Sequence, residues 1–138
     1  MAQKTREGQF FIVRASAGSG KTFRLVQDYL ICCLRHDDAH YFRRMLAITF
    51  TNKAAQEMKD RIMQDVVEVS MGKGAMWESL IAPAKNDEEA PRLLLAPDEI
   101  QKRARFLSEA MLHRYEDFSV MTIDSFVNRL VRTFARDL

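Results

Sequence analysis

Short apolar runs alternate along this chain with longer stretches in which apolar residues return every three or four positions. The short runs cover residues 10–13, 45–50 and 119–123. Their length and their aromatic or β-branched content are typical of buried strands. The periodic stretches begin near residues 22, 54 and 126, and their spacing predicts amphipathic helices. A strand, a loop and a helix therefore recur three times, which predicts an α/β fold with parallel strands joined by right-handed crossovers.

Residues that favour helix ends support these boundaries. Thr51 and Asn52 precede the second helical stretch, and Asp124 and Ser125 precede the third, so we expect these residues to start the two helices. Gly72 follows the second stretch, and glycine there predicts the end of that helix.

The segment from about residue 75 to residue 97 follows neither pattern. It holds all three prolines and an acidic patch at residues 87–89, so we expect a surface connection with some helix. Pro97, followed by two acidic residues, predicts the start of a further helix. Apolar positions from Ile100 to Tyr115 carry the helical stripe of that segment.

Length and composition are those of one globular domain. The chain has 138 residues, of which 47% are hydrophobic and 29% charged, with a net charge of +2. The hydrophobic share excludes global disorder, and the near-neutral total neither requires nor excludes a nucleic-acid partner, because a basic face can be local. No apolar run has the length of a membrane span, and the first residues lack the apolar core of a signal peptide. We therefore expect a cytoplasmic protein that does not bind a membrane.

The two cysteines, Cys32 and Cys33, are adjacent in an apolar helical run. Neighbouring residues in a helix point in different directions, so a bond between these two thiols is not expected. The pattern predicts reduced, partly buried thiols, which fits an intracellular protein.

A loop of small residues between the first strand and the first helix has the composition of a phosphate-binding loop. It consists of Ala15, Ser16, Ala17, Gly18, Ser19, Gly20, Lys21 and Thr22. Small side chains let backbone N–H groups converge on a triphosphate, and the following helix directs the positive end of its dipole at the phosphates. Lys21 can reach the β- and γ-phosphates of ATP, and the Thr22 hydroxyl can bind Mg²⁺. The alternative is a Ser/Gly-rich turn that merely ends in Lys-Thr, and Ala15 stands where the strict pattern has glycine.

Two downstream stretches narrow the class of protein. Residues 45–58 read MLAITFTNKAAQEM, which resembles motif Ia of superfamily 1 helicases of the UvrD/Rep type. Residues 120–126 read VMTIDSF, which resembles the next motif of that family, TxHSF. The phosphate loop ASAGSGKT matches the alanine-first version found in the same family, and all three motifs occur in the family's order. Within the family, the residues of the phosphate loop and of the TxDSF stretch are most similar to those of the AddA/RecB branch of helicase–nuclease subunits.

The resemblance implies a P-loop NTPase fold of the RecA-like type, with a parallel sheet and flanking helices. It implies an ATP-dependent DNA helicase or helicase–exonuclease of recombination and repair, of which this chain is an incomplete, N-terminal part of helicase domain 1. The implied partners are DNA, the rest of the helicase chain and a second nuclease subunit. The implied pieces are the strand and phosphate loop, the motif Ia strand and helix, an irregular and helical insertion, and the TxDSF strand and helix. They lie at about residues 10–34, 45–70, 75–118 and 119–138.

The resemblance also implies a site for single-stranded or double-stranded DNA. Its residues are Phe50, Thr51, Asn52, Lys53, Thr122 and Ser125. The first four follow a predicted strand, at the edge where α/β sheets place ligands. An aromatic ring can stack on a base, and the polar groups suit the sugar–phosphate chain. Two alternatives stay open: Phe50 as a core aromatic residue, and Thr51 and Asn52 as simple helix caps.

The chain departs from the family pattern at Asp124, where many relatives carry histidine, and an acid at that position would repel phosphate. Neither Gln3 nor Gln9 has the context of the family's adenine-recognition glutamine. Asp98 and Glu99 superficially resemble an acidic pair that handles Mg²⁺, but after Pro97 they are better interpreted as a helix start. The His and Asp residues at 36–40 match no compact metal site and predict a solvated loop.

Several parts of a complete motor have no counterpart in these residues. No acidic pair for metal and water activation follows residue 124, and later arginine-bearing motifs and a second motor domain have no room. We therefore expect the isolated chain not to hydrolyse ATP. The competing hypotheses are a stand-alone P-loop nucleotide-binding module or small kinase, and a degenerate, non-catalytic domain. Motif Ia and the TxDSF stretch argue against the module, because a kinase has no use for them.

Overall fold

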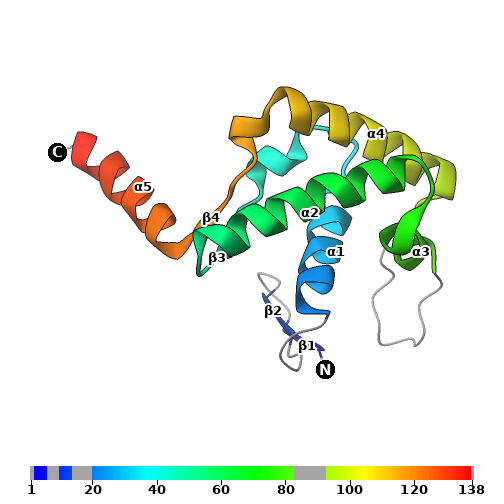
Figure 1. The fold of residues 1–138 in the computed structure, drawn as a ribbon, viewed down its shortest axis with the longest axis horizontal. Helices are drawn as coiled ribbons and strands as arrows, with labels where there is room; N and C mark the ends of the chain where they lie inside the picture. Colours follow the sequence, from blue (N-terminus) through cyan, green and yellow to red (C-terminus); the bar gives the residue numbers. More distant parts are fainter. Residues whose placement is uncertain (1, 6–9, 14–19, 83–92, 138) are drawn as a thin grey trace.

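Four helices pack together beside two small sheets, and a fifth helix leads away from them (Figure 1). The computed structural model describes residues 2–5, 10–13, 20–82 and 93–137. In chain order the elements are β1 (Ala2–Thr5), β2 (Phe10–Val13), α1 (Lys21–Leu34), η1 (Tyr41–Arg44), β3 (Ala47–Thr49), α2 (Asn52–Ser70), α3 (Gly74–Ile81), α4 (Pro97–His113), η2 (Tyr115–Asp117), β4 (Val120–Thr122) and α5 (Ile123–Arg136). The two η elements are short 3-10 helices.

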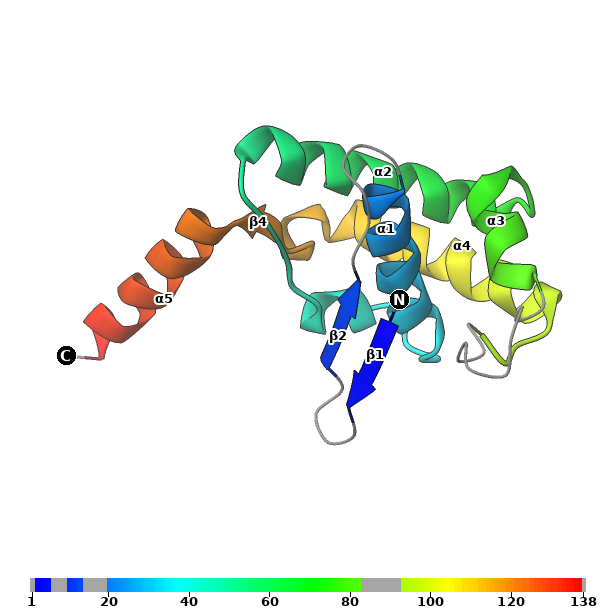
Figure 2. The same cartoon turned by 90° about the horizontal axis from the view of Figure 1, so that it is seen from below.

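The strands pair in two separate sheets. β3 and β4 are parallel, and their facing residues are Ala47 with Val120, Ile48 with Met121 and Thr49 with Thr122. β1 and β2 are antiparallel and form a hairpin, which Figure 2 shows as the two blue arrows. The α/β class and the parallel pairing of the second and third predicted strands are therefore confirmed.

The prediction of one continuous parallel sheet is wrong for the first strand. Within the described residues, β2 pairs with β1 and not with β3 or β4. A hairpin between strands that are close in sequence needs no crossover connection, whereas a parallel pairing does. The sequence AQKT of β1 has no apolar alternation, so the partner strand was not predicted. The described strands therefore form two separate two-stranded sheets, and the P-loop type of the α/β fold stays a prediction.

α2 is the centre of the helical core. α1, α3 and α4 each contact it, and α4 runs beside it along most of its length (Figure 1, Figure 2). The largest fully buried side chains come from all four helices and the loops between them: Phe42, Phe118, Leu30, Leu34, Ile62, Met76, Ile100, Leu107, Met111, Val26, Val66 and Val69. Arg103 of α4 also donates hydrogen bonds to the carbonyl oxygens of Leu34 and Arg35 at 3.1 and 3.0 Å, which ties α4 to the end of α1.

The predicted helix boundaries hold at several points. Pro97 is the first residue of α4, and Asp98 and Glu99 lie in its first turn. α2 ends at Ser70, after which Gly72 adopts a φ of +68°. The N–H of Lys73 then bonds the Glu68 carbonyl at 3.1 Å, closing the helix in a left-handed turn that favours glycine.

Tyr29 carries the one buried side-chain polar atom that lacks a hydrogen-bond partner among the described residues, its hydroxyl oxygen. We expect Tyr29→Phe to raise the free energy of unfolding by about 1 kcal/mol, because an unsatisfied buried hydroxyl is costly and phenylalanine keeps the ring. Its ring contacts Phe118 at a centroid distance of 5.8 Å, and that contact would remain. Thermal or urea unfolding measures the change.

The matched control for Tyr29→Phe is Tyr115→Phe, which removes the same hydroxyl from a side chain that is 40% exposed. The control should change stability by less than about 0.5 kcal/mol. A clear loss of stability in Tyr29→Phe alone would contradict the prediction, since it would mean that the hydroxyl has a partner.

Both cysteines are free, and Cys33 is buried while Cys32 is partly buried. Burial raises the pKa of the Cys33 thiol to about 12, so this thiol is uncharged near neutral pH. The predicted burial is confirmed for both thiols, and their reduced state stays a prediction. No helix in the described ranges is long and apolar enough to cross a lipid bilayer.

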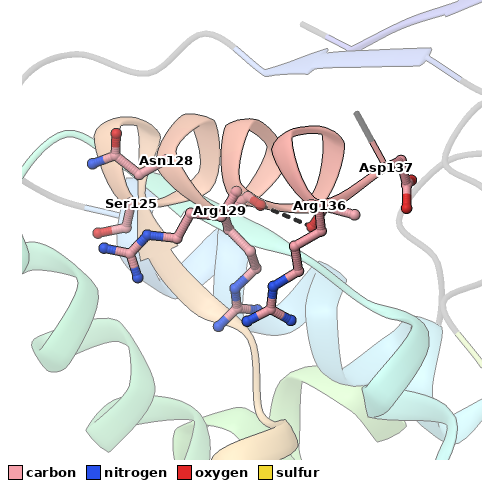
Figure 3. A pocket seen from close by; sticks show the side chains of 7 residues that line it. Ser125, Asn128, Arg129, Arg136 and Asp137 are labelled. Atoms are coloured by element: carbon pink, nitrogen blue, oxygen red, sulfur yellow. Dashed lines mark hydrogen bonds between the residues drawn. The ribbon is translucent and has the colours of Figure 1, made fainter.

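α5 leaves the body directly after β4 and has no buried residue. Its apolar face is largely exposed and is formed by Ile123, Phe126, Val127, Leu130, Val131 and Phe134. The opposite face is polar and basic, with arginine side chains projecting to one side of the helix (Figure 3). The predicted apolar side therefore exists, but it does not face a core in this structure.

Candidate nucleic-acid interface

The two motifs that follow β3 and β4 lie side by side. Thr49 faces Thr122 in the parallel register, so Phe50 and Ile123 begin the two connections at the same edge of the sheet. Each connection leads at once into a helix, α2 at Asn52 and α5 at Ile123. The carboxyl ends of two parallel strands and the N-termini of two helices therefore meet here, which is where α/β sheets commonly bind ligands.

Phe50 is not a core residue. Its side chain is 88% exposed, the highest value among the exposed large hydrophobic residues. A phenylalanine at the end of a strand with its ring in solvent gains no burial free energy, so the fold does not need it there. In this structure Phe50 therefore lies outside the core, and its exposed ring offers a face on which a base could stack.

The threonines of the two motifs cap helices. The Thr51 Oγ1 accepts a hydrogen bond from the Ala54 N–H at 3.0 Å, and Thr49 Oγ1 donates to the Thr51 carbonyl at 3.1 Å. The Thr122 Oγ1 accepts from the Ser125 N–H at 3.2 Å and donates to Ser125 Oγ at 2.9 Å. The expected start of the second helix is confirmed, whereas the third begins one residue before Asp124 and is capped by Thr122.

Exposure separates these residues into two groups. Thr122 is 6% exposed, so its hydroxyl serves the cap and the backbone, and its contact with DNA stays a prediction. Asn52, Lys53 and Ser125 are exposed at the first turns of the two helices. Lys53 Nζ lies 3.9 Å from Glu57 Oε1, and both side chains are largely in solvent, so this pair constrains the lysine little.

The charge at this edge is mixed. The first turn of α2 has no acidic residue, and Lys53 in that turn is exposed, so the positive end of the helix dipole is not offset there by a carboxylate. The first turn of α5 contains Asp124, which is exposed. A phosphate would consequently be attracted to the α2 side of the edge and repelled near Asp124.

The described part of the phosphate loop is limited to Gly20, Lys21 and Thr22. Ala15, Ser16, Ala17, Gly18 and Ser19 lie outside the described residues. Gly20 precedes α1 with a φ of +92°. Apart from its chain neighbours, no described residue has an atom within 4 Å of the point where a Cβ would stand. α1 has no side-chain cap and no acidic residue in its first turn, and no ion pair joins Lys21 to another described residue. No described side chain caps this helix start or pairs with Lys21, and the binding of ATP and Mg²⁺ there stays a prediction.

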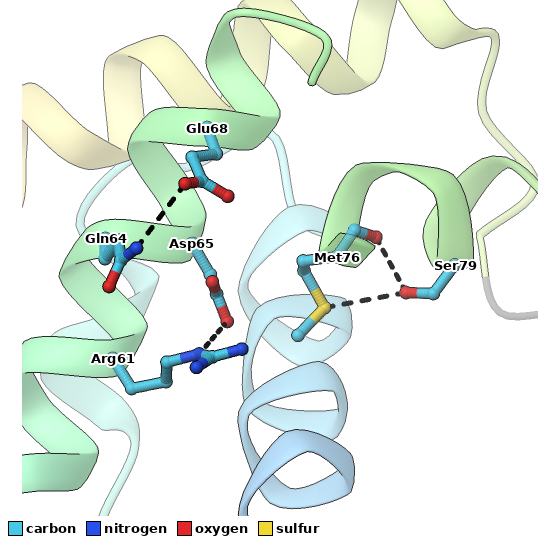
Figure 4. A network of polar contacts seen from close by, with 6 residues as sticks. All are labelled: Arg61, Gln64, Asp65, Glu68, Met76 and Ser79. Atoms are coloured by element: carbon cyan, nitrogen blue, oxygen red, sulfur yellow. Dashed lines mark hydrogen bonds and ion pairs between the residues drawn. The ribbon is translucent and has the colours of Figure 1, made fainter. Parts of the chain in front are cut away.

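An ion pair within α2 lies far from the interface (Figure 4). Arg61 Nε lies 3.1 Å from Asp65 Oδ2, and the Asp65 side chain is only 4% exposed. Burial raises the pKa of the Asp65 carboxyl, and the hydrogen bond from Arg61 opposes that shift. The buried carboxylate therefore depends on its arginine, and removing Arg61 alone would leave a buried charge without a partner.

Two groups of residues that could have been taken for metal sites have structural roles instead. Asp98 and Glu99 lie in the first turn of α4, and Glu99 Oε1 lies 2.8 Å from Arg103 Nε. This ion pair lowers the pKa of the Glu99 carboxyl. The His36 ring stacks on the Tyr41 ring at 3.8 Å between centroids, and the backbone N–H of His40 donates to Asp38 Oδ1 at 2.9 Å. Residues 36–40 form the expected loop.

The sequence reasoning missed the arginines of α5. Arg129, Arg132 and Arg136 line one hollow with Ser125 and Asn128, among others. Their spacing of three and four residues was readable as one helix face. The last helix was predicted from its apolar residues alone, and its basic face was not considered as a binding site.

Comparisons with known proteins agree with the motifs. The sequence model of the UvrD/REP helicase N-terminal domain family matches residues 2–138. An ATP-dependent helicase/nuclease subunit from Bacillus mycoides (strain KBAB4) is 44% identical over 62 residues, which is 45% of this chain and 5% of that protein. The proteins of the same name from Staphylococcus aureus strains JH9 and JH1 are each 45% identical over 64 residues, which is 46% of this chain and 5% of each protein. The chain thus matches about one twentieth of the length of these curated relatives, and no solved structure matches it.

Proposed function

Because the chain belongs to the family of UvrD/REP helicase N-terminal domains, we propose that it forms the first part of the motor of an ATP-dependent DNA helicase. The motor would couple ATP hydrolysis to translocation on single-stranded DNA in recombination and repair. The relatives named as helicase/nuclease subunits favour a helicase–exonuclease. Its partners would be DNA, the rest of the helicase chain and a second nuclease subunit, in the cytoplasm.

The observation that carries this proposal is the meeting of the two motifs at one sheet edge. The facing pair Thr49 and Thr122 brings the loop with Phe50 beside the start of α5. An exposed ring, two helix N-termini and the exposed groups of Asn52, Lys53 and Ser125 then share one surface. Single-stranded DNA offers bases to the ring and phosphates to the N–H and hydroxyl groups, which is the combination that such surfaces bind.

ATP and Mg²⁺ would bind at the start of α1. The backbone N–H groups of the loop and of the first turn would hold the phosphates, with Lys21 as the counter-charge and the Thr22 hydroxyl as a metal ligand. Mg²⁺ supplies charge neutralisation between the phosphates when it is bound. Within this chain, Lys21 and Thr22 are the residues proposed to act on the nucleotide.

The test of the proposed function is ATP hydrolysis by the parent protein with and without single-stranded DNA. DNA-stimulated phosphate release together with unwinding of a labelled duplex would support the helicase. Hydrolysis that does not respond to DNA would favour a stand-alone nucleotide-binding module or kinase and would reject the proposal.

The isolated 138-residue chain should bind ATP–Mg²⁺ weakly at most and should not turn it over. The proposed site holds phosphates, but the sequence places no acidic pair or arginine of the later motifs beside it, and loss of one arginine finger alone costs about three to five orders of magnitude in rate. Steady-state phosphate release by the purified chain, with and without DNA, measures this. Robust release that disappears in Lys21→Ala would show that the chain is a complete ATPase and would contradict the prediction.

A further inference from the structure

The polar face of α5 has a single kind of charge along most of its length. Ser125, Asn128, Arg129, Arg132, Thr133, Arg136 and Asp137 line one hollow of about 550 Å³ (Figure 3). Three of these residues are arginines, and Asp137 is the only acidic one. Arg129 and Arg136 are seven positions apart, which corresponds to about 10 Å along the helix axis, since an α-helix rises about 1.5 Å per residue.

This hollow continues toward the helical body. Arg129 also lines a second hollow of about 650 Å³. The other charged or titratable residues of its lining are Asp38, His40, Arg43, Arg44, Glu116 and Asp117. Arg43 lies 3.1 Å from Asp117 and is therefore paired. No ion pair joins Arg44, Arg129, Arg132 or Arg136 to a carboxylate within the described ranges.

One face of α5 is apolar and the other is basic, so a protein partner and a polyanion would bind to different faces of the helix. The face with Leu130 and Phe134 is apolar and exposed, so a protein layer would cover that side. The arginine face lies on the other side of the helix and would stay in solvent. A row of unpaired guanidinium groups that remains in solvent is a surface for a polyanion.

The type of polyanion follows from what the arginine face lacks. Among the residues that the structure describes, none that lines the first hollow is aromatic. Surfaces for single strands combine basic groups with aromatic platforms, as the Phe50 edge does, whereas duplex DNA keeps its bases stacked and offers phosphates at regular spacing. Charge without a stacking ring therefore fits duplex DNA better than a single strand.

We propose that Arg129, Arg132 and Arg136 of α5, with Arg44, form a contact surface for the phosphate backbone of duplex DNA. The surface adjoins the Phe50 edge at Ser125. It deepens the proposed function, on which it rests for the choice of nucleic acid. Binding there is independent of base sequence, because only phosphates are contacted. It would hold the duplex beside the strand that the Phe50 edge engages.

The test compares two triple variants of the 138-residue chain in binding to a fluorescein-labelled blunt duplex over a series of salt concentrations. Arg129→Ala/Arg132→Ala/Arg136→Ala removes the surface, and Lys73→Ala/Lys102→Ala/Arg105→Ala removes three exposed positive charges elsewhere. Both change the net charge from +2 to −1, because each removes three positive charges. Circular dichroism and thermal unfolding confirm that each variant keeps its fold.

We expect the α5 variant to bind duplex roughly tenfold more weakly and to lose about 2–3 from the slope of log affinity against log salt, because each phosphate contact contributes about 0.9. The control variant should keep the slope of the unaltered chain. Equal losses in both variants would show an effect of net charge alone and would overturn the proposal, as would an unchanged affinity in the α5 variant. A larger loss for a single strand than for the duplex would overturn the assignment to duplex DNA.

A measurement at the Phe50 edge separates this proposal from the proposed function. Single-strand binding by the parent protein should fall in Phe50→Ala and remain in the α5 variant. If the α5 variant leaves duplex affinity unchanged while Phe50→Ala weakens single-strand binding, the duplex surface is wrong and the helicase proposal stands. If neither variant affects any DNA, both proposals fail.

Discussion

Lys21→Ala in the parent protein is expected to reduce ATP hydrolysis by at least about two to three orders of magnitude, and with it to abolish unwinding. Removal of one preorganised group aimed at developing charge typically costs this much in rate. Lys21 is the first residue of α1 and is exposed, so its ammonium group contributes charge rather than packing. Phosphate release and strand displacement measured on the same preparation check the result.

The folded state should survive this substitution. Alanine is a good helix residue, and no ion pair between Lys21 and another described residue is lost. The melting temperature therefore serves as the control, together with Lys73→Ala, which removes an exposed lysine far along the chain. Unchanged turnover in Lys21→Ala would reject the phosphate-loop assignment, and so would an equal loss in Lys73→Ala.

Phe50→Ala should weaken binding of single-stranded DNA by the parent protein by roughly 1–3 kcal/mol, the worth of one base–aromatic stack. That range corresponds to about 5- to 150-fold in the dissociation constant. Because the ring is 88% exposed, the substitution removes almost no buried surface. Fluorescence anisotropy with a labelled oligonucleotide gives the affinity, and thermal unfolding gives the stability.

Leu94→Ala is the matched control for Phe50→Ala. Leu94 is 85% exposed and lies before α4, outside both motifs, so the control removes a similarly exposed apolar side chain. DNA affinity should be unaffected in it. A large drop in melting temperature for Phe50→Ala with unchanged DNA affinity would mean that the ring packs in the parent protein, and the stacking role would be discarded.

Helix positions were predictable because their signals are local. The cap at Thr51, the glycine stop at Gly72 and the proline start at Pro97 each depend on residues within one turn. Buried positions in α4, such as Ile100 and Leu107, followed from spacing alone. The parallel pairing of β3 with β4 also followed, since their similar apolar runs are separated by helices that can cross over the sheet.

Strand pairing at the start of the chain was not predictable from the same signals. A short apolar strand such as β2 can join a parallel sheet or a hairpin, and its own residues do not distinguish the two. The exposure of Phe50 also had to come from the structure, because an aromatic residue at a strand end fits a core as well as a surface. Thr122 was predicted as a DNA contact, and its cap was missed because the strand and the helix share that position.

The direct junction between β4 and α5 has a mechanical consequence. β4 ends at Thr122 and α5 begins at Ile123, so the connection contains no loop residue and no slack. The Thr122 hydroxyl bonds Ser125 in two ways, which stiffens the joint. A load that turns α5 is therefore passed to β4 as torque, and from there across the three-residue ladder to the backbone that carries Phe50.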